Sequence, residues 1–94
     1  MIIGLCTLKL YLPGTASLKE KRGQLKPLLN QLRKRFEVAV AEVEHQDVWQ
    51  TAAIAIVTVA NDTRHVHTVL DRAVNWIEEQ HPEMEILDWQ VELR

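Results

Sequence analysis

Apolar residues in the first part of the chain alternate with a period of two. Between residues 2 and 12 every even position except Gly4 is apolar, while the odd positions mix apolar and polar side chains. This pattern predicts a β-strand with one face in a core, because successive side chains of a strand point to opposite faces of a sheet. Pro13-Gly14 is expected to end the strand.

Three further segments have the composition of strands. Residues 36–44 are rich in valine and predict a second strand. Residues 52–60 are apolar on both faces, which favours a central position in a sheet. Residues 87–93 alternate between apolar and polar side chains, so they predict a last strand with one face in water.

Two segments have the periodicity of helices. Ser17 and Glu20 are spaced as in a capping box, in which both side chains pair with backbone amides at the start of a helix. The leucines that follow, at positions 18, 25, 28, 29 and 32, fall on one side of that helix. Asn61 or Asp62 caps a second helix with its own apolar stripe, which His81-Pro82 ends.

The predicted order of elements is therefore β-α-β-β-α-β. Right-handed crossovers favour the split βαβ, ferredoxin-like arrangement of the α+β class. In it the first and third strands lie in the middle of a four-stranded antiparallel sheet, and both helices cover one face. A chain of 94 residues forms a single domain, residues 1–94.

Composition narrows the class of protein. Hydrophobic residues make up 47% and charged residues 26% of the chain, which excludes disorder. A single cysteine, Cys6, excludes an internal disulfide and a cysteine-rich zinc site. We expect a cytoplasmic protein, since the chain has neither an apolar run long enough to span a membrane nor the pattern of a signal peptide.

Charge is distributed unevenly along the chain. Residues 1–36 hold eight Lys/Arg and one acid, for a net charge of +7, whereas residues 37–94 hold three Arg and twelve acids, for −9. Such asymmetry suggests a polyanionic or acidic partner. The alternative is that the two halves neutralise each other across the fold.

The first helix concentrates these cations. On a helical wheel Lys19, Arg22, Lys26 and Arg33 fall within an arc of about 60°. Lys19, Lys21 and Arg22 lie in the first turns, where cations oppose the helix dipole. Backbone amides near Ser17 would add donors for a phosphate or carboxylate. The candidate anion-binding or partner-binding residues are Ser17, Lys19, Lys21, Arg22, Lys26 and Arg33; the alternative is a solvated helix face.

Three stretches together resemble a known family. They are Leu12-Pro13 leading to Ser17–Arg22 (Ser-Leu-Lys-Glu-Lys-Arg), Phe36–Val43, and Gln46–Ala52 with its Asp-x-Trp. In this order and spacing they are similar to the YlxP-like family (domain of unknown function 503). The resemblance implies a ferredoxin-like fold in a bacterial cytoplasmic protein whose genes often lie near those for translation initiation and ribosome maturation. It carries over no catalytic residues.

The connection over residues 45–50 is a second candidate site. It lacks Gly, Pro and Asn, so it is not a tight hairpin turn. One interpretation makes His45, Asp47 and Trp49 a loop that grips a ligand. The other, which we favour, has Trp49 plug the end of the core, because burial is the commoner use of tryptophan.

The residues give little support to metal, cofactor or catalytic chemistry. His65 and His67 point about 200° apart on a helix, and no third ligand is implied, so we expect no metal site. No cofactor is expected. The loop after the first strand lacks the arginine with which acylphosphatases, enzymes of the same fold class, hold phosphate. Cys6 is expected to be a small core residue and not a nucleophile.

These observations support three hypotheses. The first is a small non-catalytic binding module, associated with RNA, the ribosome or translation through the basic helix. The second is a homo-oligomeric protein-interaction domain without nucleic-acid binding, and the third, least favoured, is a small phosphate-handling enzyme. We also expect a homodimer through the sheet face away from the helices, where the first strand places Ile3, Leu5, Thr7 and Tyr11.

Overall fold

The computed structural model describes residues 1–44 and 48–94. Its elements follow the predicted order and include both helices and all four strands. They are β1 (Ile2–Tyr11), α1 (Leu18–Phe36), β2 (Ala39–Glu44), β3 (Thr51–Ala60), α2 (Thr63–Gln80) and β4 (Glu85–Leu93). Of the helices within the described ranges, neither combines the length and apolarity needed to cross a membrane.

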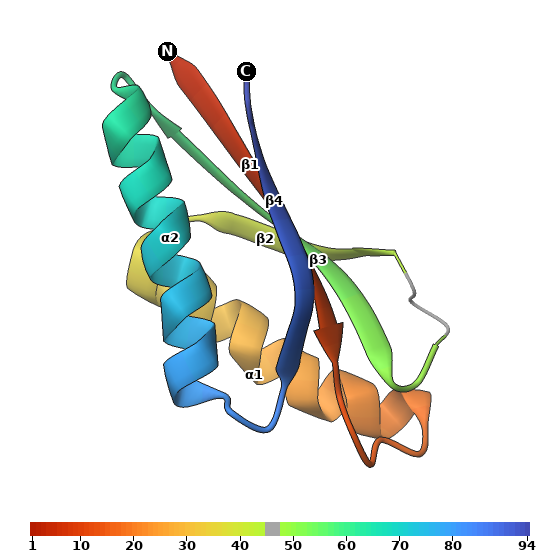
Figure 1. Ribbon diagram of the computed structural model, residues 1–94. Coiled ribbons are helices and arrows are strands. Elements are labelled where there is room, and N and C mark those ends of the chain that lie inside the picture. The colour runs from red at the N-terminus through yellow and green to blue at the C-terminus, as the bar shows by residue number, and fades with distance from the viewer. Residues whose placement is uncertain (45–47) are drawn as a thin grey trace.

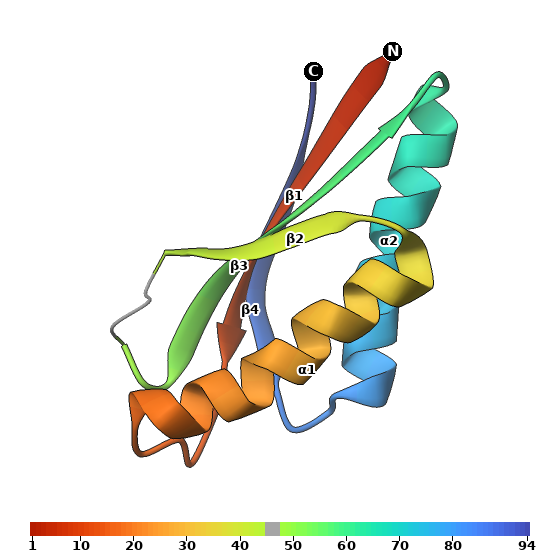
Figure 2. The same ribbon diagram turned by 180° about the vertical axis from the view of Figure 1, so that it is seen from behind.

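The four strands form one antiparallel sheet in the order β2-β3-β1-β4. Figure 1 shows α1 and α2 with the sheet, and Figure 2 shows the same arrangement from behind. The predicted ferredoxin-like topology, with β1 and β3 in the middle, is therefore confirmed. The two termini lie side by side, where Ile3 and Arg94 exchange backbone hydrogen bonds of 2.7 and 2.8 Å.

The core lies between the sheet and the helices. Even-numbered residues of β1 face it, as the alternation predicts: Cys6, Leu8 and Leu10 are fully buried. Gly4 continues this face. A methyl group added there would collide with Val66 of α2, so the glycine allows the helix to lie close to the strand.

The second strand begins later than the sequence predicts. Phe36, expected at its start, is instead the last residue of α1. Glu37 follows in the left-handed conformation, with φ at 54°, and its N–H donates to the carbonyl of Arg33. This cap ends the helix and turns the chain, so β2 starts only at Ala39.

The last strand has the predicted alternation only from Trp89 onward, because Ile86 and not Leu87 lies opposite the core residue Leu10, and its apolar face is less buried than we expected. Trp89 and Val91 lie opposite the core residues Leu8 and Cys6 of β1, yet Trp89 remains 41% exposed. A register shift between Lys9 and Leu10 interrupts the pairing with β4. Because β4 is an edge strand and the helices pack mainly on the other three, this side of the sheet is only partly covered.

Candidate functional site

The start of α1 is a capping box, in which the side chains of Ser17 and Glu20 accept hydrogen bonds from backbone amides of the same segment. The hydroxyl of Ser17 accepts from the N–H of Glu20 at 3.1 Å, as predicted. The Glu20 carboxylate accepts from the N–H of Ala16 at 2.8 Å, one residue earlier than the ideal motif. The amides of Ala16 and Glu20, two of the donors expected around Ser17, are therefore already engaged.

Lys21 is a structural residue, contrary to its place among the anion-binding candidates. Its side chain is 1% exposed, and its ammonium lies 2.7 Å from a carboxylate oxygen of Glu42 on β2. The same ammonium donates to the carbonyl of Val48 at 2.7 Å. Lys21 thus connects α1 to β2 and to the chain that leads into β3, and it is unavailable to an outside ligand.

A sequence signal for this burial was present in the helix. Lys21 precedes Leu25, Leu28 and Leu32 by four, seven and eleven residues, which places it in the buried stripe of α1. A lysine at such a position buries its aliphatic stem and needs an acid within reach of its ammonium. Glu42 meets that need because its position in β2 pairs with Ile54, a core residue of β3.

Three of the predicted cations do lie together, beside β2. Arg22, Lys26 and Arg33 line a groove of about 340 Å³, whose floor includes the apolar side chains Leu25 and Leu29. We call this hollow the α1/β2 groove; its remaining lining residues are Asn30 and Glu42. The helical-wheel prediction is thus confirmed for these three cations, whereas Lys19 is exposed but does not line the groove.

Arg33 is already engaged in the α1/β2 groove. Its guanidinium donates to the carbonyl of Val40 at 2.7 Å and to the side-chain oxygen of Asn30 at 2.9 Å. The first of these bonds connects the end of α1 to the edge strand β2. Arg22 and Lys26 are therefore more available to a partner than Arg33 is.

A second hollow lies on the other side of α1, where α2 packs against it. Two adjoining cavities of about 540 and 640 Å³ share Lys34 and Arg35 in their walls. We call them together the α1/α2 cleft. Its other charged or aromatic lining residues are Phe36 and Glu37 from the end of α1, and His65, Arg72 and Trp76 from α2.

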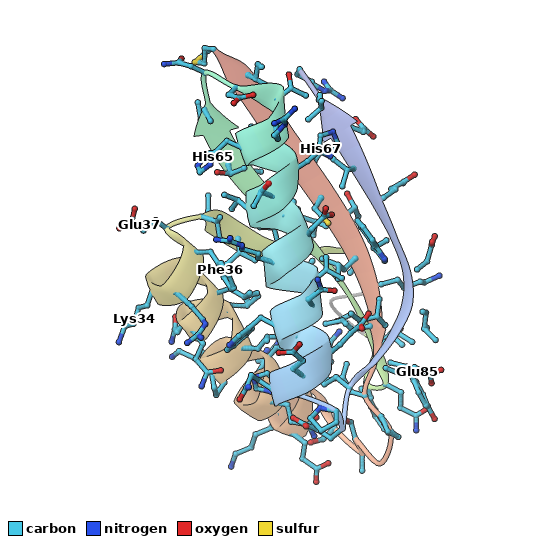
Figure 3. All side chains as sticks on the ribbon, turned by 60° about the vertical axis from the view of Figure 1, so that its left-hand side comes forward. Lys34, Phe36, Glu37, His65, His67 and Glu85 are labelled. Carbon is cyan, nitrogen blue, oxygen red and sulfur yellow. The ribbon has the colours of Figure 1, made fainter. Side chains whose placement is uncertain are left out.

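The α1/α2 cleft is a site that the sequence reasoning missed. Lys34 and Arg35 lie outside the arc of the helical wheel, and Arg72 is 37 positions beyond Arg35 on the other helix. The available signals were the basic last turn of α1 and the spacing of His65, Arg72 and Trp76 along α2. Figure 3 shows Lys34, Phe36 and His65 on this side of the molecule.

The connection before β3 is arranged differently from the favoured interpretation. His45 and Asp47 lie outside the described residues. Trp49 is 52% exposed, so it does not plug the end of the core as expected. The backbone of this segment makes the structural contacts instead: Val48 accepts from Lys21, and Gln50 accepts from the N–H of Leu12 at 2.7 Å.

The sheet face opposite the helices carries the residues predicted for it. Ile3, Leu5, Thr7 and Tyr11 lie on this side of β1, each partly exposed. Across from them on β3 are Val59, Val57, Ala55 and Thr51. This bare sheet face is apolar toward the start of β1, where Ile3 and Leu5 pair with Val59 and Val57, but the exposed Lys9 lies on the same face. Its β4 edge carries the polar and acidic residues Glu85, Asp88, Gln90 and Glu92.

The burial of Cys6 and the positions of His65 and His67 limit the chemistry that these side chains can perform. Burial, with a smaller effect of Asp71, raises the pKa of the Cys6 thiol to about 11, so the thiol stays protonated at neutral pH. His65 and His67 lie on opposite sides of α2, as predicted (Figure 3). Across residues 1–44 and 48–94 no three Cys, His, Asp or Glu side chains are grouped for a metal ion.

Comparison with known sequences identifies one family. The family described as "Protein of unknown function (DUF503)" matches residues 3–91. The chain is also 31% identical over 84 residues to a Bacillus subtilis (strain 168) protein described as uncharacterized protein YlxP, covering 89% of this chain and 90% of that one. Both findings agree with the resemblance found in the sequence.

Comparison with solved structures supports the fold alone. A putative antibiotic biosynthesis monooxygenase from Deinococcus radiodurans aligns over 100% of this chain and 90% of its own, with a TM-score of 0.55 and 19% identity. A de novo designed protein with a ferredoxin fold aligns over 100% of this chain and 84% of its own, with a TM-score of 0.56 and 11% identity. At such low identity these likenesses carry no information about activity.

Proposed function

We propose that this chain, which belongs to the DUF503 family of proteins of unknown function, is a small non-catalytic module that binds RNA through the exposed cations of α1. One observation carries the proposal. Five cations of α1 remain exposed after Lys21 and Arg33 have taken up structural contacts: Lys19, Arg22, Lys26, Lys34 and Arg35. The only acid in the helix, Glu20, is bound to the N–H of Ala16.

Such a helix favours a polyanion over a small neutral ligand. Lysines and arginines that neutralise phosphates release condensed counterions, which drives binding that weakens steeply with salt. Among the described residues that line the groove with Arg22 and Lys26, none is aromatic and able to stack on a base. The proposed contact is therefore with the RNA backbone, it has little sequence preference, and ribosomal RNA in the cytoplasm is a suitable partner.

The test is the salt dependence of binding. Affinity for ribosomal subunits and for a single-stranded RNA is measured from about 50 to 200 mM salt, the range over which phosphate contacts dominate. Arg22→Gln/Lys26→Gln should lower the affinity and reduce the salt slope by about one for each lost phosphate contact. Arg64→Gln, an exposed arginine of α2 outside both hollows, is the matched control. Absence of salt-dependent binding by the unmodified chain would refute the proposal.

The bare sheet face favours a second function, self-association. Its apolar patch joins Ile3 and Leu5 of β1 to Val57 and Val59 of β3, toward the end of the sheet where the chain termini lie, with Val59 55% exposed. An apolar patch bordered by polar residues is the usual anatomy of an interface, and here Lys9 and the acids of β4 form that border. We propose that a second copy of this chain covers the face, because a two-fold pair buries both patches at once.

Charge selects one orientation of that pair. A two-fold axis across the strands would set the acidic β4 edge of one copy against the same edge of the other. An axis along the strands instead places the β4 edge of one copy over the β2 edge of the other. We propose this second arrangement, because it keeps the two acidic β4 edges apart.

Sedimentation equilibrium at micromolar concentration tests the pair. The unmodified chain should sediment as a dimer, and Val59→Lys, at an already exposed position of the face, should convert it to a 10.9 kDa monomer. Glu79→Lys, on the exposed surface of α2, should leave the dimer intact. A monomer at every concentration of the unmodified chain would exclude self-association through this face.

A further inference from the structure

The α1/α2 cleft concentrates positive charge from two separate helices. Lys34 and Arg35 come from the last turn of α1, and Arg72 comes from the middle of α2. All three side chains are exposed, and the ion pairs recorded among the described residues do not involve them. His65 lines the same cavity as a further nitrogen donor.

Carboxylates are nearly absent from the walls of the cleft. Glu37 is the only acidic lining residue in the described part of the chain, and Figure 3 places it at the outer edge. The acids of α2 near Arg72, such as Asp71 and Glu78, do not line the cavities. Opposite charges that would neutralise the three cations are therefore scarce where a ligand would enter, in a chain whose net charge is −2.

One of these cations is held in position by an aromatic ring. The guanidinium carbon of Arg35 lies 5.9 Å from the centre of the Trp76 ring. An arginine that packs against an indole face keeps its planar array of N–H donors available for a phosphate or carboxylate. Among the exposed cations of α1, Arg35 is thus distinguished by its contact with an aromatic ring.

The indole that supports Arg35 is itself fixed on two further sides. Phe36 meets Trp76 edge to face with ring centres 6.1 Å apart, and His81 does so at 5.4 Å. His81 is anchored in turn to the side chain of Gln31 at 3.0 Å. Ordering a side chain before the ligand arrives lowers the entropy lost on binding.

We propose that the α1/α2 cleft binds a phosphate group, with Arg35 and Arg72 as hydrogen-bonding ligands and Lys34 as the neighbouring charge. Arginine matches phosphate oxygens with paired N–H donors, which lysine does not. The phosphate belongs to the RNA backbone if the function proposed above is correct, and this part of the inference rests on that function. The cleft would then be the fixed contact of the RNA, with Arg22 and Lys26 as looser ones.

The experiment uses the full chain with Trp49→Phe and Trp89→Phe, which leaves Trp76 as the only tryptophan. Its fluorescence is recorded during titration with inorganic pyrophosphate and with a short single-stranded RNA. Arg35→Gln and Arg72→Gln are compared with Arg64→Gln, and circular dichroism verifies the fold of each variant. RNA affinity should fall about tenfold in each cleft variant, as expected for a lost charged hydrogen bond, and stay unchanged in the control.

Comparing pyrophosphate with RNA distinguishes a failure of the cleft inference from a failure of the proposed function. If RNA binds and the cleft variants bind it as well as the unmodified chain does, the cleft inference is wrong and the proposed function stands. If pyrophosphate changes the Trp76 signal in an Arg72-dependent way but RNA does not bind, the cleft is a site for a free phosphate compound and the RNA function is refuted. If neither ligand binds, both are refuted.

Discussion

The two sides of α1 carry similar charge and use it differently. On the β2 side, Lys21 pairs with Glu42, and Arg33 donates to the carbonyl of Val40. On the α2 side, Lys34 and Arg35 stay exposed, and the principal recorded contact of Arg35 is with an aromatic ring. The first pair of cations holds the helix to the sheet, whereas the second is presented to solvent.

Each charged side chain of a helix therefore has to be assigned to the element that it faces before the charge is interpreted as a binding surface. Lys21 and Arg33, on the β2 side, find an acid and backbone carbonyls within reach. A cation that faces another helix finds side chains only, because the carbonyls inside that helix are already bonded. The two pairs can be told apart by measuring stability for variants of Lys21 and Arg33 and binding for variants of Arg35.

The largest expected effect is at Lys21. Lys21→Ala should reduce the free energy of unfolding by about 3–5 kcal/mol, since it leaves the Glu42 carboxylate at a partly buried position without its partner. Urea denaturation measures the loss. Lys21→Met/Glu42→Leu, which replaces both charges by apolar groups, should recover much of it.

A loss below about 1 kcal/mol for Lys21→Ala would contradict the structural role. In that case the comparison between the two sides of α1 would also fail, because Lys21 would then resemble an ordinary surface cation.

A smaller effect is expected at Arg33. Arg33→Gln removes the charged hydrogen bond to the carbonyl of Val40 and should destabilise the fold by about 1.5 kcal/mol. The matched variant is Lys34→Gln, because Lys34 is the next residue in the chain and lines the α1/α2 cleft. This substitution should change the free energy of unfolding by no more than about 0.5 kcal/mol. Equal urea midpoints for the two variants would show that the β2 side is no more structural than the α2 side.

The smallest effect is expected at Trp49. Because the side chain is 52% exposed, Trp49→Ala should cost less than about 1 kcal/mol, although the neighbouring carbonyl of Val48 holds Lys21. Thermal unfolding monitored by circular dichroism measures it. A cost of about 3–5 kcal/mol, typical of a buried aromatic residue, would restore the interpretation of Trp49 as a core plug.

Local patterns in the sequence predicted most of the fold. The alternation in residues 2–12, the capping pair Ser17 and Glu20, and the apolar stripe of α2 each reflect a geometry that extends over a few neighbouring residues. The predicted boundary between α1 and β2 was less accurate, because the helix cap at Glu37 had more influence than the β-propensity of Phe36. Phe36 has a β-forming side chain, but the left-handed Glu37 allowed α1 to extend over it.

The candidate site was predicted in part. The wheel grouped Arg22, Lys26 and Arg33 correctly, because residues three, four and seven apart share a helix face whatever surrounds it. It could not show that Arg33 would meet the carbonyl of Val40. That contact depends on where β2 lies relative to the helix.

Local sequence patterns are sufficient to predict the elements, their order and the faces that each one presents, because helices and strands have fixed periods. Which charged residues come into contact with those faces depends on how the elements pack in three dimensions. Lys21 is structural because β2 brings Glu42 to it, and Arg35 and Arg72 share a cleft because α2 packs beside the end of α1. Contacts between residues far apart in the chain depend on the packing of whole elements, which no local pattern specifies.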